Sequence, residues 1–283
     1  MSTYLRCCES CLSRRVHTAD GEREQHYHRY VVASLVGEDF HLCLDMEEIG
    51  RGEGEVVAAL RLIERVHAAY PRAYDIVMGD ALYAQAPFFQ AVLAQGKHAL
   101  AVLKQEERNL YEDAMALCAA SEPVSFERLE GRRSVQAWDL HEMTSWESLG
   151  RPVRVVRTLE KGSVRRQLDG KVEEMTCEWM WVTTLPAAGA SVRTVVELAH
   201  SRWDIENHTF NEGANEWHMN HVYCHEPAAM RAMLLLTMLA MNVFRAFVRL
   251  NLKPVLRGRY TLRHIMQLAT AEIYAATPLA ASG

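Results

Sequence analysis

The spacing of apolar residues predicts a β-hairpin followed by a helix near the start of the chain. Residues 27–36 and 40–46 are rich in β-branched and aromatic side chains, and a short loop containing Gly37 joins them, which is typical of a hairpin. Residues 53–70 instead place apolar side chains at helical spacing, and Pro71 ends that pattern. This part of the chain therefore combines both element types.

Two short apolar runs, residues 74–78 and 98–103, predict buried strands. Between them lies a predicted helix, which has Pro87 in its first turn and ends at Gly96. The order strand, strand, helix, strand, helix, strand predicts an α/β domain with a mixed sheet flanked by helices.

The pattern changes in the second half of the chain. Residues 151–159 alternate between apolar and polar side chains, and residues 175–184 are rich in aromatic and β-branched residues, so both predict strands. Residues 151–171 hold seven basic and two acidic residues. We interpret this region as a basic, β-rich insertion. Helical spacing returns over residues 192–217, which predicts one long helix.

These changes divide the chain into four parts. A polar segment with three cysteines covers residues 1–25, and the first part of the α/β domain covers residues 26–122. The β-rich basic insertion covers residues 123–186. Residues 187–283 return to helices and complete the α/β domain.

Composition excludes several classes of protein. Of the 283 residues, 49% are apolar and 24% are charged, which excludes collagen, coiled coils and a wholly disordered chain. The formal net charge is −5, so contacts with nucleic acid must come from local basic patches. Seven cysteines without an even framework indicate a reducing, cytoplasmic compartment.

The longest apolar stretch, residues 232–241, is about half as long as a membrane span requires. We therefore predict a soluble protein with no membrane partner. The surrounding Met- and Leu-rich pattern, residues 230–250, predicts a core helix beneath the sheet, and a groove for a partner helix is the alternative.

Asp80 is the first candidate for chemistry because it lies where a predicted buried strand ends and a helix follows. Ligands of open α/β sheets bind beyond the carboxyl ends of strands, so a carboxylate at this place is well positioned for a reaction. The alternative is that Asp80 only caps the following helix.

Glu206 is the second candidate. Residues four apart share a helix face, so Arg202, Glu206 and Phe210 line up, with Trp203 beside them. A glutamate between two aromatic residues is unusual for a plain solvated surface. The alternative is an exposed ion pair between Arg202 and Glu206.

The order of these elements is that of a ribonuclease H-like domain with a β-rich insertion before the Glu-bearing helix. In such domains a cluster of carboxylates holds two divalent metal ions, which activate the attacking oxygen and stabilise the leaving oxygen in phosphodiester chemistry. Mg²⁺ suits a site of this kind because it prefers oxygen ligands, and Mn²⁺ is the alternative metal.

Three motifs make the chain resemble bacterial insertion-sequence transposases of the DDE type. They are Gly79-Asp80-Ala81-Leu82-Tyr83, the run Trp181-Val182-Thr183-Thr184-Leu185-Pro186, and Arg202-Trp203-Asp204-Ile205-Glu206-Asn207. The resemblance extends from Tyr27 to about Lys253 and is closest to the group with a Tyr-x2-Arg-x3-Glu-x6-Lys signature. It implies that Asp80 is the second catalytic carboxylate, that Glu206 is the third, and that both are metal ligands.

The resemblance also implies a function and partners. Such an enzyme hydrolyses a strand at the end of the mobile element and joins the freed 3′-hydroxyl to target DNA. The expected partners are the terminal inverted repeats, target DNA and a second copy of the chain, in the bacterial cytoplasm at the nucleoid. Candidate DNA contacts are Arg202, Trp203 and four basic residues of the insertion, Arg154, Arg157, Arg165 and Arg166.

Two signature positions and one carboxylate depart from the family pattern. Ala199 stands where Tyr is usual and Gly213 where Lys is usual. Residues 1–25 show no apolar alternation and contain a single aspartate, Asp20, while Asp45 lies late on its predicted strand. We expect that the opening strand and its Asp are missing, through truncation or a misplaced start, and that this polypeptide alone does not cut DNA. The alternatives are a non-catalytic DNA-binding remnant and a host ribonuclease H-like nuclease.

Two groups of Cys and His residues offer other metal ligands. Cys7, Cys8 and Cys11, with His17, His26 or His28 nearby, form a possible zinc site, against the alternative of a disordered segment. A second group, Trp217, His218, His221, Cys224 and His225, follows the Glu-bearing helix, and a polar loop is its alternative interpretation.

Overall fold

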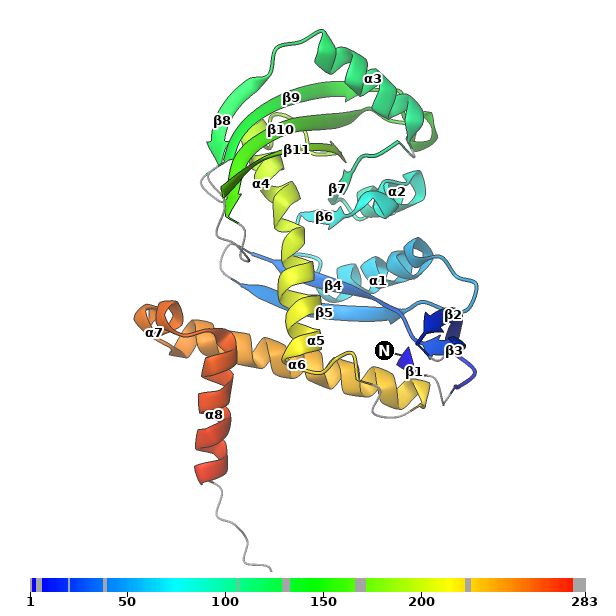
Figure 1. Cartoon of the computed structure of the whole chain (residues 1–283). Coiled ribbons are helices and arrows are strands. Elements are labelled where there is room, and N and C mark those ends of the chain that lie inside the picture. The colour runs from blue at the N-terminus through cyan, green and yellow to red at the C-terminus, as the bar shows by residue number, and fades with distance from the viewer. Residues whose placement is uncertain are drawn as a thin grey trace, which may run out of the picture. The chain divides into compact units, whose positions relative to one another are not determined.

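The structure is a computed structural model, drawn in Figure 1. It describes the chain except residues 1, 4–6, 20, 38–39, 106, 129–132, 166–171, 222–224 and 277–283. The chain forms two compact units. The larger unit contains residues 30–33 and 47–204, and the smaller contains residues 1–29, 34–46 and 205–283.

A six-stranded mixed sheet is the centre of the larger unit. Its strands are β6 (Ile76–Gly79), β7 (His98–Val102), β8 (Val124–Arg128), β9 (Arg133–Met143), β10 (Val153–Arg165) and β11 (Val172–Thr183). Their order is β6-β7-β11-β10-β9-β8, in which β6 and β7 are parallel and all other neighbours are antiparallel. The basic region predicted as an insertion therefore extends the same sheet that begins with β6 and β7.

Helices cover both faces of this sheet. The first face packs on α1 (Glu55–Ala69), α2 (Ala86–Ala94) and α3 (Arg108–Ala119), and the second face packs on α4 (Val192–Ser201). Ala99 and Ala101 of β7 face the first group of helices, while Leu100 and Val102 face α4, because successive strand residues point to opposite sides. The prediction of an α/β fold with a mixed sheet flanked by helices is confirmed.

The smaller unit begins with short strands. The strands β1 (Ser2–Thr3), β2 (Leu12–Thr18) and β3 (Gly21–Tyr27) form an antiparallel sheet in the order β1-β3-β2. The alternative interpretation of the cysteine-containing segment as disordered is thus wrong for its described part. Polar cross-strand contacts stabilise the hairpin, such as the 2.7 Å hydrogen bond from Arg14 Nε to Gln25 Oε1, so its pattern carries no apolar alternation.

The predicted hairpin of residues 27–46 is present as β4 (Tyr30–Val36) and β5 (His41–Glu48), which form a two-stranded sheet with residues in both units. The predicted long helix over residues 192–217 is interrupted. After α4, the π-helix η3 (Ile205–Asn211) and the short α5 (Glu212–Asn215) follow. The remaining helices are α6 (Pro227–Asn251), α7 (Pro254–Arg259) and α8 (Leu262–Ala276).

The helix α6 differs from the predicted core helix. One side of it is buried, with Met230, Met238 and Met241 at 3% exposure or less, whereas Leu236 and Val243 are about 60% exposed. In the described residues it is also the helix that is long and apolar enough to cross a membrane by length and composition, a criterion that core helices of soluble proteins also meet. Charged residues interrupt the apolar residues of this helix, so the longest uninterrupted apolar stretch in the sequence is shorter than the helix itself.

Candidate active site

Asp80 lies directly after the C-terminal end of β6 and is exposed to solvent. Its Oδ1 accepts a hydrogen bond of 2.9 Å from the Leu82 N–H, so the side chain caps the short 3₁₀ helix η1 (Ala81–Tyr83). The two interpretations of this residue are therefore compatible, because a cap uses one carboxylate oxygen and fixes the direction of the other.

Close packing behind Asp80 explains the Gly-Asp-Ala-Leu-Tyr motif. A Cβ atom at Gly79 would lie 2.6 Å from Cβ of Tyr83, so only glycine lets this side chain pack onto the end of β6. The Tyr83 hydroxyl donates a 2.9 Å hydrogen bond to Glu55 Oε1 of α1, and its ring lies 5.0 Å from that of Phe88. These contacts hold the turn that presents Asp80.

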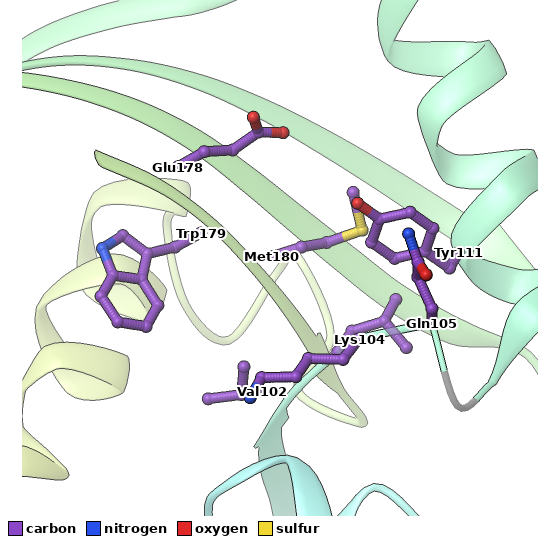
Figure 2. A pocket seen from close by; sticks show the side chains of 8 residues that line it. Val102, Lys104, Gln105, Tyr111, Glu178, Trp179 and Met180 are labelled. Carbon is purple, nitrogen blue, oxygen red and sulfur yellow. The ribbon is translucent and has the colours of Figure 1, made fainter. Parts of the chain in front are cut away.

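A pocket of about 480 Å³ opens at the neighbouring strand end (Figure 2). Leu103 donates a 2.8 Å hydrogen bond to the Met180 carbonyl as the chain leaves β7, and the pocket forms just beyond this point. Figure 2 shows the side chains of Trp179 and Met180 on opposite sides of β11. The lining residues are Val102, Leu103, Lys104, Gln105, Tyr111, Glu178, Trp179 and Met180. Because β6 and β7 are parallel neighbours, the pocket and Asp80 lie at the same edge of the sheet.

An aromatic cluster connects this pocket with the end of α4. The ring of Trp179, which lines the pocket, lies 6.0 Å from Trp203 in an edge-to-face arrangement. The Arg202 guanidinium stacks over the Trp203 ring at 4.6 Å from its centroid, and Trp203 is 39% exposed. Two of the predicted DNA contacts, Arg202 and Trp203, thus lie together beside the pocket.

Glu206 is exposed and lies at the start of the π-helix η3, in the smaller unit. Thr209 of this helix is 1% exposed and forms a 3.1 Å hydrogen bond with Ser34 of β4. Arg245 of α6 donates to the His208 carbonyl and, at 2.9 Å, to Glu212 Oε2. These contacts position Glu206 within its unit, as η1 positions Asp80 within the larger unit.

A family model described as the transposase DDE domain matches residues 2–243. The chain belongs to this family. No curated protein matches the sequence. The predicted identity as a DDE transposase is confirmed, and the matched range of the transposase domain includes both Asp80 and Glu206.

Two of the predicted DNA contacts of this transposase domain form ion pairs with carboxylates of the same sheet. Arg154 is 4% exposed, and its Nε and Nη2 donate to both carboxylate oxygens of Asp139 at 2.7 and 2.8 Å. Arg157 Nε donates to Glu178 at 2.8 Å, and its guanidinium stacks on Trp138. The burial of Arg154 conflicts with a role in DNA binding. The side chain of Arg165 and the whole of Arg166 lie outside the described residues.

The two residues that depart from the resembled signature lie at buried positions. Ala199 is 4% exposed in the core between α4 and the sheet. A Cβ atom at Gly213 would lie 2.7 Å from the sulfur of Met219, so a lysine does not fit there without a local shift. The structure of this transposase domain thus accommodates small residues at both positions.

A buried charge cluster, which the sequence did not indicate, fixes α4 to the sheet. The Glu160 side chain is fully buried, and its oxygens lie 2.5 Å from His200 Nε2, 3.4 Å from Arg128 Nη1 and 3.3 Å from Arg133 Nη1. Burial by itself raises the pKa of this carboxyl. The hydrogen bond from the imidazole and the two guanidinium charges outweigh burial, so the pKa of Glu160 lies below its usual value. A single acidic residue at an inward position of an alternating strand is the signal that could have revealed it.

Proposed function

We propose that the chain is a DNA transposase of a bacterial insertion sequence, in which Asp80 and Glu206 are ligands of Mg²⁺ or Mn²⁺. The observation that carries this proposal is the position of Asp80 at the C-terminal end of β6, beside the pocket at the end of β7. When bound, divalent ions of this kind activate the attacking oxygen and stabilise the leaving oxygen of a phosphodiester.

The donor groups fit such ions. Asp80 and Glu206 are both exposed carboxylates, and carboxylate oxygens are the protein ligands that Mg²⁺ prefers. Asp80 uses Oδ1 for the backbone of η1, so the turn restricts the orientation of the whole carboxylate.

Arg202 and Trp203 are proposed to bind the DNA backbone next to this edge. The guanidinium group matches phosphate in geometry and charge, and its stacking on the Trp203 ring restricts its motion. The exposed ring offers a surface on which an unpaired base can stack. The proposed substrates are the terminal inverted repeats and target DNA, with a second copy of the chain bound to them in the cytoplasm.

We propose further that no carboxylate of the chain takes the place of the first one that the resemblance implies. Within the described part of the larger unit, β6 has a strand neighbour on one side only. Asp45 is on β5, where its Oδ1 accepts the N–H of Met46 at 2.8 Å. We therefore propose that this polypeptide binds DNA but does not cut or join it by itself.

DNA binding is tested by fluorescence anisotropy with a labelled duplex over a range of salt concentrations. Each phosphate that the protein neutralises contributes about 0.9 to the slope of log affinity against log salt, so Arg202→Ala should lower the slope by about 0.9. Arg108→Ala is the control, since Arg108 is 78% exposed on α3. A flat salt response, or equal slopes for both variants, contradicts the proposed contact.

Metal binding is tested with Mn²⁺ by electron paramagnetic resonance. Asp80→Asn should weaken Mn²⁺ binding by more than about tenfold. Asp75→Asn is the matched control, because Asp75 directly precedes β6 and its side chain is 96% exposed. Equal Mn²⁺ affinities of the two variants would refute the ligand assignment. Nicking of duplex DNA that Asp80→Asn abolishes and Asp75→Asn retains would instead show a complete catalytic set.

A further inference from the structure

Four metal-ligating side chains from distant parts of the sequence meet in the smaller unit. Their ligand atoms all lie within 4.8 Å of one another. Two come from the turn before β2, one from the link between β3 and β4, and one from the segment before α6. We call this set the Cys₂His₂ cluster; its members are Cys8, Cys11, His28 and His225.

Four distances within the cluster are close to those of a tetrahedral zinc site. With Zn–S bonds of about 2.3 Å and Zn–N bonds of about 2.05 Å, two sulfur ligands lie about 3.8 Å apart, and a sulfur and a nitrogen ligand about 3.6 Å apart. The two sulfur atoms are 3.7 Å apart. His28 Nε2 is 3.4 Å from Cys8 Sγ and 3.3 Å from Cys11 Sγ, and His225 Nδ1 is 3.7 Å from Cys11 Sγ.

The burial of its side chains distinguishes this cluster from a chance group of residues on the surface. Cys11 is 1% exposed and His28 is 4% exposed, whereas the neighbouring Cys7 is exposed. The Cys8-x-x-Cys11 segment forms a tight turn, with the Cys11 N–H donating to the Cys8 carbonyl at 3.2 Å. The Cys8 N–H donates to Cys11 Sγ at 3.3 Å, which fixes the position of this sulfur atom. The segment is thus arranged to direct two sulfur atoms at one point.

We propose that the Cys₂His₂ cluster binds a structural Zn²⁺ ion. Two thiolates neutralise the charge of the ion, and two imidazoles complete a tetrahedron, which is the closed donor set of structural rather than catalytic zinc. Of the three histidines considered near the cysteines, the geometry selects His28, and the fourth ligand comes from the second Cys and His group of the sequence.

The zinc ion connects the N-terminal hairpin to the start of α6. Glu226, next to the ligand His225, caps α6 by accepting the N–H groups of Ala228 and Ala229 at 3.1 and 2.6 Å. Further along α6, Arg245 contacts the π-helix that carries Glu206. The ion therefore stabilises the first turn of the helix that supports the Glu206 segment. This inference does not depend on the proposed catalytic function.

The test measures the metal in the purified full-length chain. We expect about one zinc per chain by inductively coupled plasma mass spectrometry, since the cluster supplies one complete tetrahedron. Cys11→Ser should lose the zinc, and the adjacent Cys7→Ser should retain it. Likewise His28→Ala should lose it, and His17→Ala, whose side chain is 87% exposed, should retain it.

Cobalt substitution gives a second readout that does not rely on stable variants. Co²⁺ in the wild-type chain should show the intense visible bands of tetrahedral coordination and thiolate charge-transfer absorption, and Zn²⁺ should displace it. A weak octahedral spectrum, iron in place of zinc, or a wild-type chain that binds no Zn²⁺ on titration would each overturn the proposal. Retention of zinc by Cys11→Ser would overturn the ligand assignment.

Discussion

The most informative perturbation of the larger unit is the removal of the buried charge at Glu160. The substitution Glu160→Gln keeps the size of the side chain and leaves the two guanidinium groups without their carboxylate. Removing one partner of a buried ion pair costs about 3–5 kcal/mol. Arg128 is 7% exposed and bears this cost, whereas Arg133 is 26% exposed and regains water, so we expect about 3 kcal/mol.

Urea denaturation followed by tryptophan fluorescence measures this loss. Five of the six tryptophans lie in the larger unit, and two of them, Trp179 and Trp181, contact His200. With a slope of about 2–3 kcal/mol per molar urea, the midpoint should fall by about 1–1.5 M. Glu178→Gln is the control, because its side chain is 45% exposed and an exposed pair contributes about 0.5 kcal/mol.

The pH dependence of the unfolding free energy tests independently whether the folded protein lowers the pKa of Glu160. Because the folded protein lowers the pKa of Glu160, its stabilisation is fully present above the unfolded pKa of about 4.3 and is lost as the pH falls through the lower folded value. The difference in unfolding free energy between wild type and Glu160→Gln should be constant from neutral pH down to about 5 and then decrease. A difference below about 0.5 kcal/mol at neutral pH, or one that grows in acid, would refute the reasoning.

Three further substitutions test contacts that position the two carboxylates or the neighbouring elements. Gly79→Ala puts a methyl group 2.6 Å from Cβ of Tyr83, so thermal melting should show a loss of about 1–3 kcal/mol. Arg61→Ala removes the hydrogen bonds that hold the pKa of Glu53 at about 2, and a carbon NMR titration should find that pKa raised toward its usual value, with an unchanged pKa counting against the contact. Asn242→Ala removes two hydrogen bonds, of 2.9 and 2.7 Å, between α6 and the backbone of β5, so amide exchange in β5 should accelerate while exchange in β7 stays constant.

Much of the larger unit could be predicted from the sequence, because its strands and helices have distinct apolar spacing. The place of Asp80 followed from the Gly-Asp pair after an apolar run, and the strand end and the capping interaction are both confirmed. The number of basic residues in a region was a weaker guide to the residues that contact DNA. The sequence shows Arg154 as one of several arginines, and only the fold brings it to Asp139.

The smaller unit was harder to predict for physical reasons. The hairpin of β2 and β3 is stabilised by polar cross-strand pairs, and apolar periodicity cannot detect such a strand. His28 and His225 belong to one cluster although almost the whole transposase domain separates them in the sequence. Whether Asp80 and Glu206 share ions remains a prediction from the sequence.

The π-helix that begins beside Glu206 has a consequence for tolerated changes in length. A π-helix closes its hydrogen bonds one residue later than an α-helix, so it accommodates a residue that a regular helix has no place for. Deleting one residue between Asn207 and Asn211 would let this stretch wind regularly, and because a π turn holds one residue more than an α turn, the direction of Glu206 relative to α5 would change little. Members of the family that are one residue shorter here could then present their glutamate in nearly the same direction.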